Sequence, residues 1–531
     1  MAKPVLRRPA KFPVVEHLSV AREPTVEKRR NRYPVAQDRT LAPMQRTLWM
    51  SQRMHPEAPV QNMAMLVHID GEIDAARLAA AFDKLVDEVD VLRTRIVEHQ
   101  GTPTVRLDAE RQQEKIVSIS RDDAEQWASA RVARPIDISV RGYDSVILRH
   151  EDNTVSWYLA LHHTITDATS SVNVFSATAA IYHQKPIECG SYYAWAQQFQ
   201  KSLTTGSSAD VDPTSRRRDK AAQLWQQRSP APRIEQLYQP VGTAGTTAQR
   251  IPLQIDDRLT DLIKQRLADD YRMLSPELAW SVLLVTVTAV YIHKVARANE
   301  FSIGLPVHNR NDPETRHLIG PVMEVFPVDI SIQQGETFRE LYKRVSRSVL
   351  RTLGQAVVGT APTGDYAAVV NVIPRTSIGS FGSVPTTMRR IHSGAIDSNH
   401  LLRVQLFSHN NPSAEGVTGL PTLALDLNHS AAQPDHRRWA LNHFLRLLHV
   451  MLDDPDQTMD VSMPDGDELD TIIAWESAED FTGDTENLPD WLRSSLQENN
   501  SVALRRKTGN GVARCSGVKW NLSPPGCANV A

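Results

Sequence analysis

The feature that most constrains this chain is a pair of adjacent histidines at the end of an apolar run. Residues 155–161 read VSWYLAL, and His162, His163 and Asp167 follow closely. The run mixes aromatic and aliphatic residues over the length of a strand, so it predicts a buried strand. Residues 167–171 contain Asp, Thr and Ser, which cap helices, and predict that a helix begins there. The histidines then lie where a strand gives way to a loop, a common position for a catalytic side chain.

The two histidines are expected to differ in their tasks. Side chains of adjacent strand residues point to opposite faces, so one imidazole should face a cleft while the other packs inside. A neutral imidazole accepts or steers a proton near physiological pH. Asp167 can orient such a site only if a cation holds it, because a lone buried carboxylate is costly. A buried, hydrogen-bonded histidine pair without chemistry is the alternative interpretation of this stretch by itself.

Length and composition set the scale of the fold. With 531 residues the chain is too long for one ordinary domain, and two lobes are expected. A hydrophobic share of 41% and a net charge of −3 give no reason to expect nucleic acid or a membrane as partner. The longest apolar segment, residues 278–292, is short for a membrane span. Three cysteines argue for a cytoplasmic protein without a disulfide framework.

The histidine stretch resembles the HHxxxDG core of the condensation domains of nonribosomal peptide synthetases, which belong to a wider superfamily of thioester-dependent acyltransferases. The resemblance covers roughly residues 40–475 and includes further motifs. Residues 41–49 resemble the family's opening motif, residues 303–310 its IGxPVxxR segment, and residues 319–329 its IGxFVNTLPLR segment. Ala168 stands where the family has glycine, which narrows the allowed backbone if φ is positive there.

The resemblance implies an α/β (α+β) fold. Two chloramphenicol-acetyltransferase-like lobes, each with a mixed sheet flanked by helices, are expected to enclose the active site in the cleft between them. The N-terminal lobe is expected over residues 40–199 and the C-terminal lobe over residues 221–475. Residues 200–220 contain Ser, Asp, Pro and an arginine run, and predict an exposed linker. Ser275 and the proline after it predict the start of a buried helix that ends near residue 296.

The resemblance also assigns roles to the site residues. It implies that His163 is the catalytic histidine facing the cleft and that His162 is structural. Arg310 matches the family arginine that holds the motif aspartate, so an ion pair with Asp167 is expected.

Three further residues are candidates for the cleft. Asn371 matches a polar family position near the site, Glu324 replaces a family asparagine, and Ala168 is the third. The sequence has no CxxC or HExxH pattern, so no metal is expected.

The implied function is formation of an amide bond between a carrier-bound acyl or peptidyl thioester and a carrier-bound aminoacyl acceptor, or of an ester with an alcohol acceptor. The 4′-phosphopantetheine arms, or CoA, would arrive with the partners, because the sequence has no serine-centred carrier motif to be modified. Donor and acceptor carrier proteins and adjacent synthetase modules are the expected partners. Two alternatives stay open: a stand-alone acyltransferase that uses CoA or one carrier, and a non-catalytic module that recruits carrier proteins.

The resemblance to condensation domains covers neither end of the chain. Residues 1–39 are rich in Arg, Lys and Pro and predict a basic, disordered segment. Residues 476–506 resemble the start of an adenylation domain, and the resemblance stops there. Residues 507–531 have scattered glycines and prolines and predict an unfolded, dispensable tail. The chain is therefore expected to be a fragment of a longer synthetase or the product of an interrupted gene.

Overall fold

The computed structural model divides the chain into two compact units, residues 1–463 and 464–531. The predicted basic segment 1–39, apart from Arg39, and residues 476–504 of the adenylation-like segment lie outside the described residues. The structure describes residues 39–204, 213–238, 245–253, 257–362, 364, 366–373, 380–407, 422–432, 434–464, 466 and 468–470, and the backbone of 505–508, 511–514, 520–523 and 527–530.

The first sheet of the larger unit has six strands in the order β11-β12-β1-β6-β5-β4. Neighbouring strands are antiparallel except β4 and β5, so the sheet is mixed, as predicted. Its strands are β1 (Asn62–Ile69), β4 (Ile116–Ser118), β5 (Tyr143–Arg149), β6 (Val155–His162), β11 (Ser380–Phe381) and β12 (Val384–Ile391). Its helices are α3 (Ala75–Glu88), α4 (Ala124–Val132) and α5 (Ala168–Tyr182).

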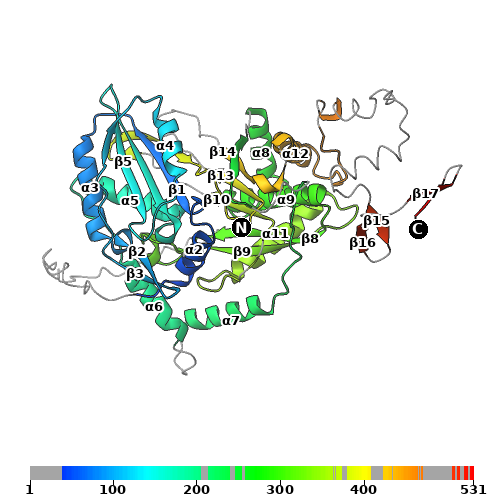
Figure 1. Cartoon of the computed structure of the whole chain (residues 1–531), viewed down its shortest axis with the longest axis horizontal. Helices are drawn as coiled ribbons and strands as arrows, with labels where there is room; N and C mark the ends of the chain where they lie inside the picture. Colours follow the sequence, from blue (N-terminus) through cyan, green and yellow to red (C-terminus); the bar gives the residue numbers. More distant parts are fainter. Residues whose placement is uncertain are drawn as a thin grey trace, which may run out of the picture. The chain divides into compact units, whose positions relative to one another are not determined.

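Strand β6, which carries the histidines, lies in the middle of this sheet and is buried along its whole length. Trp157, Leu159 and Leu161 pack in one core with α3 and α5. Tyr158 and Ala160 face the opposite way and pack in a second core with α4. The continuous apolar run therefore reflects a strand covered by helices on both faces (Figure 1).

The second sheet has the order β7-β14-β13-β10-β8-β9. Strand β10 is parallel to β8 and β13, and the other neighbours are antiparallel, so this sheet is mixed as well. Its strands are β7 (Ala248–Leu253), β8 (Glu300–Val307), β9 (Glu324–Ser331), β10 (Ala368–Ile373), β13 (Leu402–Phe407) and β14 (Thr422–Asn428). Its helices are α8 (Asp257–Ala268), α9 (Pro276–Ala296), α11 (Phe338–Gln355) and α12 (Pro434–Asp453).

Helix α9 begins where the sequence predicts. The Ser275 hydroxyl accepts a hydrogen bond from the Leu278 amide at 3.2 Å, and Pro276 is the first helical residue. By length and composition the helix could cross a membrane, but residues 282–292 are buried in the core beneath the second sheet. Its uniform apolarity is explained by packing against α11, α12 and β10 (Figure 1).

Two segments cross the predicted boundary between the lobes. Strand β12 belongs to the predicted C-terminal lobe by sequence but pairs with β1, where Ala64 lies opposite Ile391. Leu318 and Val322 likewise pack in the core of the first sheet. Strand neighbours are chosen by burial and free hydrogen-bonding edges, which sequence order does not reveal.

The predicted linker also has more structure than expected. Helix α6 (Tyr192–Thr204) enters it and α7 (Pro213–Gln227) occupies its second part. The arginine run lies on α7, where Arg216 and Arg217 are exposed and Arg218 is buried with its guanidinium over the Phe199 ring. The shorter elements of the unit are α2 (Pro43–Met54), η1 (Asp90–Arg93), β2 (Arg95–His99), β3 (Thr102–Arg106), η2 (His163–Ile165), α10 (Pro313–Arg316) and η3 (His429–Ala431).

Residues 507–531 are predicted to be an unfolded tail, and the described part of the chain in this region has strands in its backbone. Strands β15 (Arg505–Thr508) and β16 (Gly511–Arg514) form one antiparallel hairpin, and β17 (Trp520–Ser523) and β18 (Cys527–Val530) form another. Gly and Asn stand between β15 and β16, and this pair favours a two-residue hairpin turn. An isolated two-stranded hairpin is at best marginally stable, so the dispensability of the tail stays a prediction.

Candidate active site

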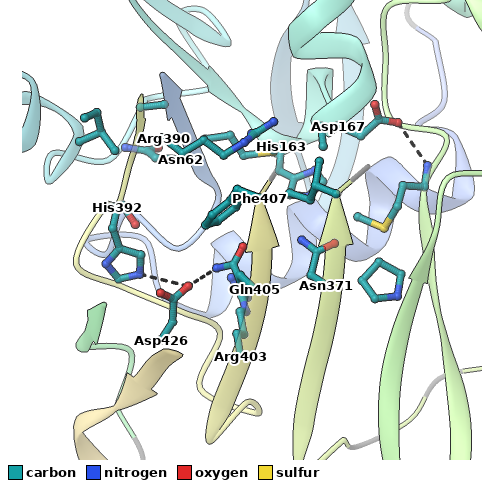
Figure 2. Close-up of a pocket in the computed structure, with 18 of the residues that line it drawn as sticks. Asn62, His163, Asp167, Asn371, Arg390, His392, Arg403, Gln405, Phe407 and Asp426 are labelled. Carbon is teal, nitrogen blue, oxygen red and sulfur yellow. Dashed lines mark hydrogen bonds and ion pairs between the residues drawn. The ribbon is translucent and has the colours of Figure 1, made fainter. Parts of the chain in front are cut away.

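A cavity of about 320 Å³ lies between the two sheets of the larger unit (Figure 2). Strand β1, the turn η2 and helix α5 contribute Asn62, His163 and Ala168 to its wall, and the second sheet contributes Asn371 and Phe407. The volume lies at the lower end of the range for small-molecule sites. The sequence-predicted cleft between two lobes is therefore present as a cavity walled by both sheets.

His162 is the last residue of β6 and is fully buried. Its Nδ1 lies 2.8 Å from the Thr164 hydroxyl and 3.2 Å from the Thr164 amide, which donates to it. Burial lowers the pKa of His162 to about 3, so the ring is neutral at physiological pH. It packs inside the first lobe and does not line the cavity.

His163 is the first residue of the 3₁₀ turn η2 and lines the cavity. Its Nδ1 lies 2.8 Å from the Thr166 carbonyl oxygen. Because a carbonyl oxygen only accepts hydrogen bonds, Nδ1 carries the proton and Nε2 keeps its lone pair. Burial lowers the pKa of His163, which favours this neutral form. The ring is thus held as a hydrogen-bond and proton acceptor at the cavity wall.

Two polar contacts fix the turn that presents this ring. The His163 amide donates to the Gln61 carbonyl at 2.8 Å. Gln45 on α2 donates from Nε2 to the Thr164 carbonyl at 3.0 Å and to the Tyr193 hydroxyl at 3.1 Å. Gln45 is the glutamine of the opening motif, so that motif supports the histidine turn from behind.

Asp167 caps α5, and its side chain accepts a hydrogen bond from the Ser170 amide at 2.8 Å. The Arg310 Nη2 lies 3.0 Å from Oδ1 and 2.8 Å from Oδ2, and the Val322 amide donates to Oδ2 at 3.0 Å. Burial alone would raise the pKa of Asp167, but the Arg310 charge and these amide donors outweigh it and lower the pKa. The predicted ion pair between Asp167 and Arg310 is therefore present, in its ionised form.

Arg310 ties the loop after β8 to the start of α5. Its Nη1 donates to the Thr315 and Leu318 carbonyls at 2.7 Å each. Its Nη2 also contacts the Ser170 hydroxyl at 2.7 Å and the Gly320 carbonyl at 2.8 Å. The guanidinium is buried behind the cavity wall and does not line it, so it positions the Asp167 turn from outside the cavity.

Comparison with known proteins places this geometry in a family. Residues 35–359 match the family model for the condensation domain. The chain belongs to the condensation domain family. Condensation domains of nonribosomal peptide synthetases are acyltransferases that form amide bonds.

Sequence relatives of this condensation domain are much longer proteins. An isonitrile lipopeptide synthase of Streptomyces coeruleorubidus is 25% identical over an alignment of 426 residues that covers 73% of this chain and 27% of the relative. A dimodular nonribosomal peptide synthase of Bacillus subtilis is 22% identical over an alignment of 324 residues that covers 58% of this chain and 13% of the relative. The chain thus spans only a small part of the relatives that it matches.

Solved structures share the fold. The starter condensation domain of rhizomide synthetase, in complex with C8-CoA and Leu-SNAC, has a TM-score of 0.65 at 18% identity, covering 81% of this chain and 98% of that one. The first condensation domain of the calcium-dependent antibiotic synthetase, in complex with a substrate analogue, has a TM-score of 0.65 at 18% identity, covering 81% of this chain and 100% of that one. The expected two-lobed α/β fold is confirmed.

The remaining predicted cleft residues of the condensation domain separate into two groups. Ala168 and Asn371 line the cavity. Ala168 is the first residue of α5 and is not among the residues with positive φ, so alanine replaces the family glycine without backbone strain.

Glu324, the third candidate, is not among the residues that line the cavity. Its carboxylate turns away and accepts hydrogen bonds from Asn309 Nδ2 at 3.1 Å and from the Gly359 amide at 2.7 Å. Met323, the preceding residue, lines the cavity instead, because successive residues of an extended chain point to opposite sides. Burial raises the pKa of Glu324 to about 7.

The sequence motifs did not point to the polar residues on the cavity face of the second sheet. Arg403, Gln405 and Asp426 line the cavity, while their neighbours Val404 and Leu425 pack in the helix-covered core. The signal was present as period-two alternation in LRVQLF and TLALDLN, where each polar residue is flanked by apolar ones. When one face of a strand packs in the core and the other face carries polar side chains that are also buried, the polar face indicates the wall of a cavity.

Proposed function

We propose that the chain catalyses amide bond formation between an acyl thioester donor and an amine acceptor in the cavity beside His163. The observation that carries the proposal is the fixed tautomer of His163, whose Nδ1 donates to the Thr166 carbonyl and leaves Nε2 as an acceptor at the cavity wall. A buried histidine pair without chemistry would have no need to keep one ring at a cavity. The Asp167–Arg310 pair supports the turn that presents this ring.

The proposed reaction balances without any further reagent. The acceptor amine nitrogen attacks the thioester carbonyl carbon, the C–N bond forms, and the C–S bond breaks. His163 Nε2 accepts a hydrogen bond from the amine and takes its proton as the bond forms, and the departing thiolate regains a proton. Because an amine of pKa about 8 is partly neutral at physiological pH, orientation of the amine contributes as much as proton removal.

The thioesters are proposed to arrive on 4′-phosphopantetheine arms of donor and acceptor carrier proteins. The synthetases among the relatives support this proposal for the partners. CoA is the alternative carrier of the donor, and the rhizomide synthetase domain bound to C8-CoA supports including it in any assay. We further propose that residues 476–506 begin an adenylation domain, and reading the coding sequence beyond residue 531 tests this.

Purified protein with a loaded donor carrier and a loaded acceptor carrier tests the proposed function, with the product measured by mass spectrometry. The wild type should form the amide on the acceptor carrier. The His163→Ala variant should lose about 10²- to 10⁴-fold in rate, the usual contribution of a general base, at an unchanged melting temperature. His99→Ala, which removes an exposed histidine at the end of β2, is the matched control.

Three outcomes separate the proposals. Near-normal turnover of His163→Ala would contradict the role of that ring. Product from acyl-CoA and a free amine, but not from loaded carriers, would favour a stand-alone acyltransferase. Carrier binding without product in any arm would favour a non-catalytic recruitment module.

A further inference from the structure

Three arginines gather along the cavity wall that the second sheet and β12 form. Arg250 lies on β7, Arg390 on β12 and Arg403 on β13, and all three line the same cavity as His163. In Figure 2, Asp167 is drawn to one side of His163 and Arg390 to the other, with Phe407 between His163 and the group around Asp426. We name Arg250, Arg390 and Arg403 the arginine wall.

Asp426 is a carboxylate beside the arginine wall and is paired with Arg250. The Arg250 Nε donates to its Oδ1 at 2.6 Å and the Arg250 Nη2 donates to its Oδ2 at 2.8 Å. Gln405 donates to the same Oδ2. His392 lies 3.7 Å from it and is neutral at physiological pH, because burial lowers the pKa of His392 to about 4. Asp426 is therefore paired with Arg250, and among the described residues it makes no hydrogen bond to Arg390 or Arg403.

A second carboxylate, Asp397, does not line the cavity and accepts a hydrogen bond from Ser51 at 2.5 Å. The charges of Asp426 and, to a smaller extent, Asp397 both act on Arg403. His400 contacts Arg403 at 3.3 Å and is neutral, since burial lowers the pKa of His400 to about 4. Two carboxylates thus compensate the three guanidinium groups of the arginine wall, so one positive charge has no compensating carboxylate.

The remaining charge is that of Arg390. Its Nε and Nη2 are buried and make no hydrogen bond among the described residues. Its guanidinium carbon lies 5.7 Å from the centre of the Phe407 ring, which stabilises a cation without using its N–H groups. Burial and the charge of Arg250 lower the pKa of Arg390 only to about 10, so it stays charged at neutral pH. A charged, buried donor set facing a cavity is costly unless a ligand completes it.

We propose that the arginine wall binds the carboxylate of an acidic substrate, with Arg390 as its direct partner. The inference rests on the proposed function and adds the substrate class: a donor acyl group or an acceptor amino acid that carries a negative charge. A planar guanidinium with free N–H groups matches a carboxylate in geometry and charge. Because the same cavity holds His163, the carboxylate would anchor one end of the substrate while its reacting end lies beside Nε2.

Substrate analogues that cannot react test this directly. The donor arm compares glutaryl and glutaramyl groups, and the acceptor arm compares glutamyl and glutaminyl groups, each joined to pantetheine by an amide in place of the thioester. Within each pair only a carboxylate is exchanged for a carboxamide. We expect the carboxylate to bind about tenfold more tightly or better in one arm, as measured by titration calorimetry, and that arm identifies which substrate is acidic.

Variants of neighbouring arginines provide the control. Arg390→Gln should reduce the preference for the carboxylate to about twofold or less, whereas Arg390→Lys, which keeps the charge, should retain part of it. Arg389→Gln should leave the preference unchanged, because Arg389 lies on the outer side of the same strand and pairs with Glu125 at 3.0 Å. Thermal unfolding should show that Arg390→Gln folds as well as the wild type, since it removes an unpaired buried cation.

Two results would overturn the proposal. Equal binding of carboxylate and carboxamide in both arms would mean that Arg390 only packs in the cavity wall and binds no anion. A preference for the carboxylate that survives Arg390→Gln would mean that the anion binds to other residues. Amide formation is measured on the same samples with reactive thioesters of each acidic and neutral donor and acceptor. Failure of every combination would count against the proposed function, and the binding data with inert analogues would still test the arginine wall by themselves.

Discussion

Arg310 Nη2 lies 2.8 Å from Asp167 Oδ2, and this contact joins residues 143 positions apart whose side chains are 3% and 2% exposed. It fastens the loop after β8 to the first turn of α5, and so connects the second sheet to the segment that follows the histidine turn. Since both charges are removed from water, each depends on the other for compensation. The ion pair thus holds the two lobes together and also fixes the position of His163.

Breaking this pair should destabilise the fold. We expect Asp167→Asn and Arg310→Met each to lower the free energy of unfolding by about 3–5 kcal/mol, and the double variant to cost less than the sum. Urea denaturation measures all three. Arg53→Met is the control, because its ion pair with Glu98 is largely exposed and should be worth about 1 kcal/mol or less. A decrease in the free energy of unfolding as small as that of Arg53→Met would show that the ion pair does not hold the lobes together.

His162 should govern part of the acid sensitivity. Its pKa falls from 6.5 to about 3 in the folded state, so the unfolded chain binds the proton first as the pH falls. Stability should therefore decline below about pH 6.5, with a contribution from this ring of up to about 1.4 kcal/mol per pH unit. His162→Ala should lower the melting temperature at neutral pH and flatten that slope. An unchanged slope in denaturation curves between pH 7 and pH 4 would contradict this assignment.

Glu324 should have the opposite pH dependence. Its pKa rises from 4.5 to about 7 on folding, so its contribution to stability is present below pH 4.5 and is lost as the pH rises through 7. Glu324→Gln keeps an acceptor for Asn309 and Gly359 and removes the buried charge. We expect it to raise the free energy of unfolding at pH 8 by as much as about 3 kcal/mol, with little change near pH 5. A destabilised variant at pH 8 would mean that the carboxylate itself is required.

Gly320 should tolerate no side chain. Its φ is +142°, and a Cβ atom there would lie 2.0 Å from the Tyr192 ring. Gly320→Ala should cost about 3 kcal/mol or more, since the carbonyl that accepts from Arg310 must shift with the backbone. Gly335→Ala controls for backbone strain, because its φ is +75° and no atom lies near the added Cβ. Equal melting temperatures for the two variants would rule out the contact with Tyr192 as the cause.

The local features of the site followed from the amino-acid sequence. Apolar periodicity placed β6 and α9, and the capping residue Ser275 fixed where α9 begins. These two elements depend on backbone propensities and on short stretches of neighbouring residues, which a single sequence displays directly. The pairing of Asp167 with Arg310 was implied by the resemblance to the family's motifs, and the structure has that contact.

Which distant segments line the cavity together was settled only by the tertiary structure. Strand β12 joins the first sheet beside β1, and this pairing carries Arg390 to the cavity that His163 lines. The same packing turned Glu324 away from the cavity and extended helices into the predicted linker. The choice of strand neighbours follows from the burial of whole surfaces, to which every segment contributes at once, so no local pattern in the sequence encodes it.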